Sequence, residues 1–186
     1  MVLYHGTDSE SAKDILQNGI RVKEGNESTD FGQGFYTTES LKFAIKSANR
    51  ASKRTDNPPA LLQFDFDSNK ARGIKFFRAS TKEWAQFIVN NRCGLEYVAA
   101  TKTGEHNLDG KFEIVQGRIA DGNVVDFAQD CLEKTSVVTD EDAKMIYSES
   151  YPEQITFHSQ RSIRLLRNGR EIPIEGGEIH EKRKEL

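Results

Sequence analysis

Three short motifs contain the residues of this chain whose types could do chemistry. The first, near the start of the sequence, is Leu3-Tyr4-His5-Gly6-Thr7. A histidine at a strand end can hydrogen-bond through its ring, and a following glycine leaves its backbone N–H and C=O groups open to a ligand. A ligand with a ribose hydroxyl and a carboxamide would suit both groups. The alternative is a structural histidine at a turn.

The second motif joins a glycine bend to an aromatic strand. It is the run Asp30-Phe31-Gly32-Gln33-Gly34-Phe35-Tyr36-Thr37-Thr38. The two glycines allow a tight turn, and the aromatic and β-branched residues after them favour a strand. Such a strand could hold an aromatic face against a flat ligand, or it could bury a core phenylalanine. The third glycine of a dinucleotide fingerprint is missing, so this pattern does not favour a Rossmann fold.

The third motif is Glu153-Gln154-Ile155-Thr156-Phe157-His158, late in the chain. Neighbouring residues of a strand point to opposite faces of the sheet. Glu153 therefore shares a face with the apolar Ile155 and Phe157, which indicates the core. Gln154 shares the other, polar face with Thr156 and His158. His158 could line a binding site or make a structural hydrogen bond.

Short strands and helices are expected to position these motifs. A strand ends near His5, and a helix follows from an N-cap at Asp8 or Ser9 to Gly19. A second strand at 35–38 precedes a helix at 39–54, whose basic residues we expect on a solvated face. Further strands are expected at 60–66, 75–77, 112–115 with an extension over 117–120, and 154–158. Further helices are expected at 81–91, 128–134 and 141–148, with a turn at 121–123 and another short element beginning at 163–166. The irregular order predicts an α+β fold rather than alternating βαβ units.

Length and composition restrict the class of protein. The 186 residues predict one domain over 1–175, followed by a polar, frayed tail at 176–186. The net charge of -3 gives no overall basic footprint for nucleic acid, which leaves only a local patch open. Cys93 and Cys131 lie far apart and outside any metal-binding spacing, so we expect reduced thiols, no metal site and a cytoplasmic protein. We expect no signal peptide and no membrane-spanning segment.

In their order and spacing the three motifs resemble the His-Tyr-Glu class of ADP-ribosyltransferases, which includes diphtheria toxin and the poly(ADP-ribose) polymerases. They are more similar still to a family of small bacterial proteins of unknown function with the signatures YHG[ST], DFGxGFYxT and QI[ST]FH. The resemblance covers about residues 3–166. It implies two split antiparallel β-sheets around an NAD cleft, with peripheral helices, and NAD as the substrate.

The resemblance also implies roles for individual residues. His5 would bind the adenosine ribose, Gly6 would pair with the nicotinamide carboxamide, and Tyr36 would stack on the nicotinamide ring. Asp30 would sit at the mouth of the cleft. The implied NAD-binding set is His5, Gly6, Thr7, Phe31, Gly34, Phe35, Tyr36, Thr37 and Thr38. Arg78 and Arg92 could meet the pyrophosphate, although surface or ion-pair roles are favoured for both.

The third catalytic position is ambiguous by sequence. Aligned with the polymerases, Glu153 would be the carboxylate that hydrogen-bonds the ribose 2′-hydroxyl, where positive charge grows as the nicotinamide leaves. The small bacterial family keeps the glutamine, and strand alternation also favours Gln154. With His5 and Tyr36, these two residues complete the implied catalytic set. A glutamine can hydrogen-bond the hydroxyl but cannot act as a base. Three alternatives follow: a carboxylate from elsewhere in the chain, transfer of single groups to a good nucleophile, or binding without turnover.

The sequence therefore predicts a mono-ADP-ribosyltransferase that acts on a protein or nucleic-acid acceptor, as a bacterial toxin or effector. A cognate antitoxin or immunity protein would be its partner, and no membrane partner is expected. The expected location is the cytoplasm, with secretion as an effector as the alternative. The alternatives are a non-catalytic module that binds NAD or ADP-ribose, and an NAD glycohydrolase. RNA 2′-phosphotransfer is disfavoured, because the chain lacks a basic footprint and an arginine cluster.

Overall fold

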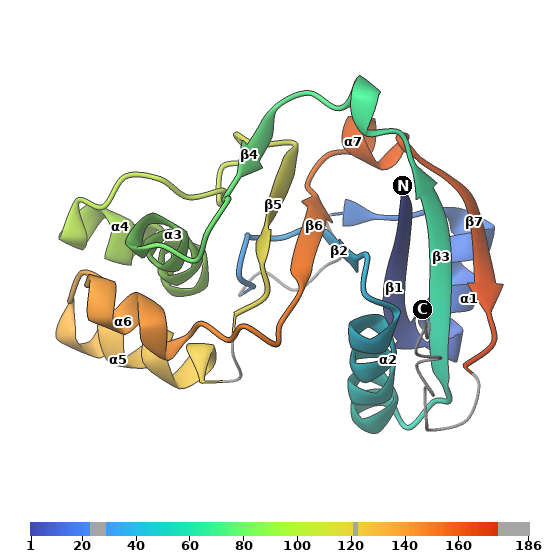
Figure 1. The fold of residues 1–186 in the computed structure, drawn as a ribbon, viewed down its shortest axis with the longest axis horizontal. Coiled ribbons are helices and arrows are strands. Elements are labelled where there is room, and N and C mark those ends of the chain that lie inside the picture. Colours follow the sequence, from blue (N-terminus) through green and yellow to red (C-terminus); the bar gives the residue numbers. More distant parts are fainter. Residues whose placement is uncertain (23–28, 121–122, 175–186) are drawn as a thin grey trace, which may run out of the picture.

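The chain forms a mixed α+β structure around one sheet (Figure 1). The structure is a computed structural model that describes residues 1–22, 29–120 and 123–174. The strands are β1 Val2–Asp8, β2 Phe35–Thr38, β3 Pro59–Phe66, β4 Ile74–Phe76, β5 Ile114–Arg118, β6 Glu153–Phe157 and β7 Leu166–Ile172. The helices are α1 Ser9–Asn18, α2 Leu41–Thr55, the 3-10 helix η2 Ser68–Lys70, α3 Lys82–Cys93, α4 Leu95–Thr101, α5 Val124–Lys134, α6 Asp140–Met145 and α7 Gln160–Ile163.

The seven strands lie in the order β4-β5-β6-β2-β1-β3-β7. β4 runs parallel to β5, and all other neighbours are antiparallel, so the sheet is mixed. β1 pairs with β3 along its whole length, and β2 pairs with β6 along all four residues. A single residue pair, Tyr4 with Thr38, joins β1 to β2. The sheet therefore consists of two well-paired halves with a narrow junction between them.

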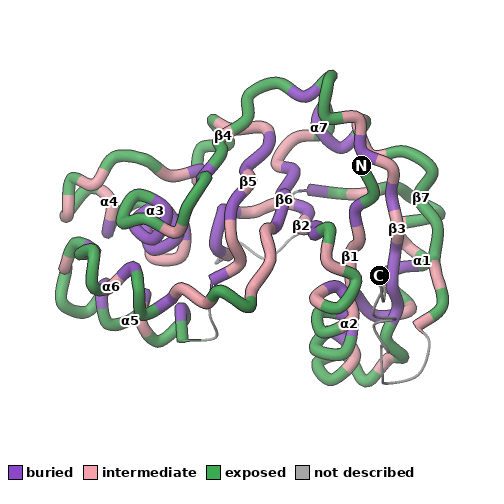
Figure 2. The backbone as a smooth tube through the Cα atoms, in the orientation of Figure 1, coloured by how far each residue is buried: buried purple, intermediate pink, exposed green. Residues whose placement is uncertain are grey.

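The first half carries α1 and α2 on opposite faces. Asp8 caps α1 by accepting hydrogen bonds from the backbone N–H groups of Glu10 and Ser11 at 3.1 Å. The α1 residue Ala12 packs with the face of the sheet that carries Leu3. α2 lies on the other face with its alanine side buried, and Figure 2 shows its outer side exposed.

The second half carries the cluster α3 to α6 beside β5 (Figure 1). Trp84, Phe87 and Ile88 of α3 are completely or almost completely buried at the centre of this cluster. The Trp84 indole also donates a hydrogen bond to the Arg118 carbonyl oxygen at 3.1 Å, which ties α3 to the end of β5. This helical cluster has its own group of buried apolar side chains, whereas a second group, which includes Leu3, Phe35 and Phe157, extends across the β1–β2 junction.

Most of the expected elements are present, with several differences. α4, η2, α7 and the strand β7 were not predicted, although a short element was expected to begin at 163–166 and β7 begins at Leu166. β1 continues to Asp8 rather than ending near His5, and α5 begins at Val124 rather than at Ala128. β7 was missed because it is an edge strand whose middle residues are all exposed, so it lacks the apolar alternation of a half-buried strand. α4 has only seven residues and follows α3 after a single glycine, Gly94, whose φ is 88°.

Two expectations fall partly or wholly outside the described residues. These are the turn at 121–123, of which the structure describes only Asn123, and the tail at 176–186. Among the helices of the described ranges, none is both long and apolar enough to span a membrane.

Candidate functional site

The junction between β1 and β2 is held open by a side chain. Beyond Tyr4, no further residue pair joins the two strands in the described part of the chain. The Nδ1 atom of His5 instead lies 2.7 Å from the Tyr36 carbonyl oxygen. Because a carbonyl only accepts, Nδ1 carries the proton, and the neutral ring keeps its Nε2 lone pair as an acceptor. Burial lowers the pKa of His5, which favours this neutral form.

A cavity of about 440 Å³ lies at this junction. Five residues of the first two motifs line it: His5, Thr7, Gly34, Phe35 and Tyr36. Its other lining residues come from α1, the segment after it and the end of α2: Ser11, Asp14, Ile15, Gly19, Ile20, Arg21, Thr29 and Arg54. The volume falls within the range of small-molecule sites. The cavity thus unites the His5 motif with the aromatic strand.

Several polar atoms of this cavity are available to a ligand. His5 Nε2, Thr7 Oγ1 and the Arg54 guanidinium have no hydrogen-bond or ion-pair partner among the described residues. None of these atoms is a fully enclosed, unsatisfied group. Arg21, by contrast, forms an ion pair with Asp14. The open groups comprise an acceptor, a hydroxyl and a cation, which are the complements of a ribose, an amide and a phosphate.

Tyr36 is fixed at the cavity by its hydroxyl group. That oxygen accepts a hydrogen bond from the Phe31 N–H at 2.9 Å and lies 2.8 Å from both Thr29 Oγ1 and the Gly32 carbonyl oxygen. Burial, and secondarily the negative charge of Asp30, raise the pKa of Tyr36. The phenol therefore stays protonated at neutral pH, so Tyr36 can present its ring but cannot serve as a base.

The third motif presents its glutamine and its glutamate on opposite faces of β6. Gln154 pairs across the ladder with Thr38, and Thr156 pairs with Tyr36, so these side chains share one face. Glu153 lies on the other face, where its Oε2 accepts a hydrogen bond from Gln116 Nε2 at 2.7 Å. Gln154 is therefore on the same face as Tyr36 and Glu153 is not, although neither residue is among those that line the cavity.

A buried ion pair holds Gln154. Asp30 Oδ1 accepts hydrogen bonds from Arg92 Nε at 2.9 Å and Nη2 at 2.6 Å. Asp30 Oδ2 accepts one from Gln154 Nε2 at 3.2 Å. A carboxylate only accepts, so it fixes which end of the glutamine amide faces it. The Gln154 Oε1 atom then points away from Asp30 and has no partner in the described ranges.

The structure places four other expected binding residues away from the cavity. Phe31 is completely buried in the core beside α3, so its ring is not exposed to the cavity. Thr37 and Thr38 donate hydrogen bonds to the Ile155 and Glu153 carbonyl oxygens, each at 2.7 Å, and thereby tie β2 to β6. Gly6 is the fourth of these residues, and it packs against α2. Asp30, expected at the mouth, is only 8% exposed.

Two glycines of the motifs have packing roles. A Cβ atom at Gly6 would lie 1.8 Å from the Ala44 carbonyl oxygen, so only glycine lets α2 approach β1 this closely. A Cβ atom at Gly34 would lie 2.6 Å from His158 Nδ1. His158 is itself a structural residue, with Nδ1 2.8 Å from the Gln33 carbonyl oxygen and Nε2 2.7 Å from Thr156 Oγ1. Both glycines therefore have packing roles, and only Gly34 lines the cavity.

Sequence reasoning missed Arg21 and Arg54 as residues of the site, whereas it had named Arg92 and Arg78. Arg21 and Arg54 line the cavity, and Arg92 holds Asp30, whereas Arg78 is exposed on a loop outside it. The ion-pair role expected for Arg92 is the one that the structure has. The only sequence signal for Arg54 was its place at the end of a helix rich in basic residues.

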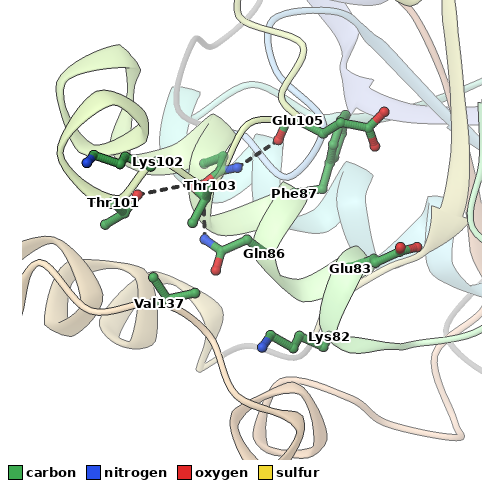
Figure 3. A pocket seen from close by; sticks show the side chains of 10 residues that line it. Lys82, Glu83, Gln86, Phe87, Thr101, Lys102, Thr103, Glu105 and Val137 are labelled. Carbon is green, nitrogen blue, oxygen red and sulfur yellow. Dashed lines mark hydrogen bonds between the residues drawn. The ribbon is translucent and has the colours of Figure 1, made fainter.

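A second polar cavity, of about 540 Å³, lies in the helical half of the molecule (Figure 3). Its floor is a network of amide and hydroxyl groups. Asn90 donates to the Glu105 carbonyl oxygen at 2.7 Å and accepts from Gln86 at 3.0 Å and Thr103 at 2.9 Å. Gln86 Oε1 accepts from the Val138 N–H at 2.9 Å. These groups bind one another and hold the segment after α4 against α3.

Comparison with known proteins gives one match. Residues 1–168 match the model of a protein family described as "Protein of unknown function (DUF3990)". No curated protein and no solved structure matches the chain. The family carries no assigned activity.

Proposed function

The chain belongs to the DUF3990 family of unknown function, and we propose that it binds NAD at the β1–β2 junction. We propose further that it transfers single ADP-ribose groups to an acceptor. The single observation that carries this proposal is the junction itself. His5 spans it, a cavity of about 440 Å³ opens beside it, and Tyr36 is among the residues that line that cavity.

The proposed fold is the split sheet of the ADP-ribosyltransferases. The single Tyr4–Thr38 pair between two well-paired halves supports it. In this arrangement the open edge of β1, from His5 onward, is where the resemblance puts the adenosine ribose and the nicotinamide carboxamide. His5 Nε2 and the Thr7 hydroxyl have no hydrogen-bond partner among the described residues. We propose that they form hydrogen bonds with hydroxyl and amide groups of the dinucleotide.

NAD supplies a ribose–nicotinamide bond whose cleavage releases neutral nicotinamide and lets an acceptor nucleophile bond to the same ribose carbon. Tyr36 would stack on the nicotinamide ring, with its hydroxyl already fixed by three protein groups. Gln154 would accept a hydrogen bond from the ribose 2′-hydroxyl through Oε1, since Asp30 holds the other end of the amide. A fixed acceptor stabilises the positive charge that grows on the ribose.

Neither Gln154 nor Tyr36 can remove the acceptor's proton. Gln154 is neutral at every pH, and the raised pKa of Tyr36 keeps the phenol protonated. Asp30 is occupied by Arg92 and Gln154. The acceptor would therefore be a good nucleophile that loses its proton to water, which favours single transfer over chain elongation.

Two further candidates follow from the same observation. A chain with glutamine in place of a catalytic glutamate could bind NAD or ADP-ribose without turnover, or it could let water take the place of the acceptor and act as a glycohydrolase. We also propose that the protein acts as a bacterial toxin or effector with an antitoxin or immunity partner. Its proposed location is the cytoplasm.

Nicotinamide release from NAD, measured with and without a cell extract as the source of acceptors, tests the proposal. The two neighbours on β6 form a matched pair of variants. We expect Gln154→Ala to lower the rate by about 100-fold, the usual loss for one electrostatic contact to a transition state. Glu153→Ala should keep the rate within about twofold, because its side chain faces away from Tyr36.

The controls separate the candidates. His5→Ala should abolish NAD binding, while His106→Ala, a histidine of the 102–110 loop, should not. NAD that raises the melting temperature without nicotinamide release would indicate the binding module. Free ADP-ribose as the sole product would indicate the glycohydrolase. Loss of turnover in Glu153→Ala but not in Gln154→Ala would refute the assigned third residue.

A further inference from the structure

The exposed face of α2 is positively charged along its length. The helix contains five basic residues and no acidic residue: Lys42, Lys46, Arg50, Lys53 and Arg54. All five side chains are exposed, and none forms an ion pair with an acidic residue in the described part of the chain. This local charge stands against a net charge of -3 for the whole chain.

The helical period sets these cations on one side. At about 100° per residue, Lys42, Lys46, Arg50 and Lys53 fall within an arc of about 80°, with Arg54 at its flank. The buried alanines of α2 lie on the opposite side, against β1. Figure 2 shows this division as an exposed outer face and a buried inner one. We call Lys42, Lys46, Arg50, Lys53 and Arg54 the cationic face of α2.

An aromatic pocket lies at the N-terminal end of the cationic face. The rings of Phe43 and Tyr151 meet edge to face with centroids 4.9 Å apart, and the Lys46 ammonium lies 4.6 Å from the Phe43 centroid. These residues line a cavity of about 440 Å³ together with Ser40, Lys42, Arg118, Glu149, Ser150 and Pro152. Both rings are only partly buried. Glu149 is the one carboxylate among the lining residues of this cavity.

The C-terminal end of the cationic face reaches the proposed NAD cavity, because Arg54 lines it. The 15 residues of α2 give the helix a length of about 22 Å. An aromatic pocket and the NAD cavity are thus connected by a row of unpaired cations. Cations along a groove combined with aromatic rings that stack on bases are the common features of proteins that bind single-stranded nucleic acid.

We propose that the cationic face of α2 and the aromatic pocket bind single-stranded nucleic acid, and that this strand is the acceptor in the proposed transfer. The phosphates would follow the cations, and a base would enter the pocket beside Phe43 and Tyr151. The binding part stands on α2 and the pocket alone, whereas the acceptor part rests on the proposed function. A free-standing basic helix would bind any polyanion, but the pocket adds a preference for bases.

Binding is tested without NAD, so that its outcome is independent of turnover. A fluorescent 12-nucleotide single strand is titrated with the full chain, and anisotropy is followed over a range of salt concentrations. We expect Arg50→Ala with Lys53→Ala to weaken binding by at least tenfold at low salt and to reduce the salt slope by about 1.4, the value for two lost phosphate contacts on a single strand. Arg78→Ala with Lys144→Ala removes two exposed, unpaired cations elsewhere and should leave both quantities unchanged.

Phe43→Ala tests the pocket separately from the charge. We expect it to weaken binding to the oligonucleotide several-fold while binding to heparin, which has no bases, stays the same. Equal losses in the α2 and control pairs would overturn the proposal, as would equal affinity for the oligonucleotide and an acidic polyglutamate peptide, which would point to a protein partner. Transfer of radiolabel from NAD to the bound strand tests the acceptor role. If the protein bound the strand but transferred the label to a protein acceptor instead, the acceptor role alone would be overturned.

Discussion

Two of the cavities, one in the helical half and one at the β1–β2 junction, differ in what their polar atoms do. The cavity of about 540 Å³ in the helical half has a floor of amides and hydroxyls that bind one another, and the exposed Lys82, Glu83 and Lys102 also line it. The cavity of about 440 Å³ at the β1–β2 junction presents His5 Nε2, the Thr7 hydroxyl and the Arg54 guanidinium without partners in the described ranges. The first set of groups stabilises the fold, and the second is open to a ligand.

The difference shows that cavity volume alone does not identify a binding site. In the larger cavity, the hydrogen bonds of the amide and hydroxyl floor are filled by the 101–105 segment and by the Val138 N–H. A ligand there would compete with the protein's own bonds. At the junction, the free energy of new hydrogen bonds is available without breaking any. The following predictions test this contrast.

The largest expected effect concerns His158, which ties the turn at Gln33 and Gly34 to β6 beside the junction. Burial lowers the pKa of His158 from 6.5 to about 4. The unfolded chain therefore binds a proton at a higher pH than the folded chain does, so this contribution to stability is complete above pH 6.5 and is lost as the pH falls toward 4. We expect a loss of up to about 3 kcal/mol in the free energy of unfolding over this range, measured by urea denaturation.

His158→Gln should flatten this dependence, while His106→Gln should keep it. His5 has a pKa lowered by burial as well and acts in the same direction, so a residual slope is expected. A wild-type stability that does not change between pH 6.5 and 4 would contradict the structural role given to His158.

A smaller effect is expected at Asn90, in the helical cavity. Asn90→Ala removes one hydrogen bond each from the Gln86 amide, the Thr103 hydroxyl and the Glu105 carbonyl oxygen. We expect the free energy of unfolding to fall by about 2 kcal/mol, because buried polar groups then lose hydrogen bonds. NAD affinity, measured by calorimetry below the melting temperature, should be unchanged.

Asn123→Ala is the matched control, since this exposed asparagine makes no capping hydrogen bond with its side chain. Its stability should stay within about 0.5 kcal/mol of the wild type. If Asn90→Ala instead weakened NAD binding and left stability intact, the contrast between the two cavities would be reversed.

The smallest effect is expected at Thr7, in the junction cavity. Thr7→Val keeps the shape of the side chain and removes a hydroxyl that has no partner among the described residues. The free energy of unfolding should change by less than about 0.5 kcal/mol, whereas NAD affinity should fall about fivefold, the equivalent of one neutral hydrogen bond. Unchanged affinity would remove Thr7 from the binding set.

Local features of the sequence predicted much of this arrangement. The strand and helix before Gly19 follow from a capping aspartate and helical periodicity, and the structure has both. The choice between Glu153 and Gln154 followed from strand alternation, and the ladder with β2 puts Gln154 on the side of Tyr36. β7 could not be predicted in the same way, because an exposed edge strand has no buried face to leave a pattern.

The buried cluster at Asp30 lay beyond such reasoning. Gln154 is 124 positions from Asp30, and Arg92 is 62 positions from it. Each residue looks like an ordinary polar residue in its own segment. Only the packing of α3 and β6 against the glycine bend brings them together, and only then does the carboxylate fix the orientation of the glutamine amide.

The sequence by itself determined which residues could do chemistry and which face of each strand they occupy, because both depend on residue type and on short periods. The tertiary structure decided which of them share a site. It placed His5 across from Tyr36 and buried Phe31 in the core, and it packed Gly6 against α2. It also brought Arg54 to the cavity. These outcomes depend on contacts between distant segments, and no local pattern encodes them.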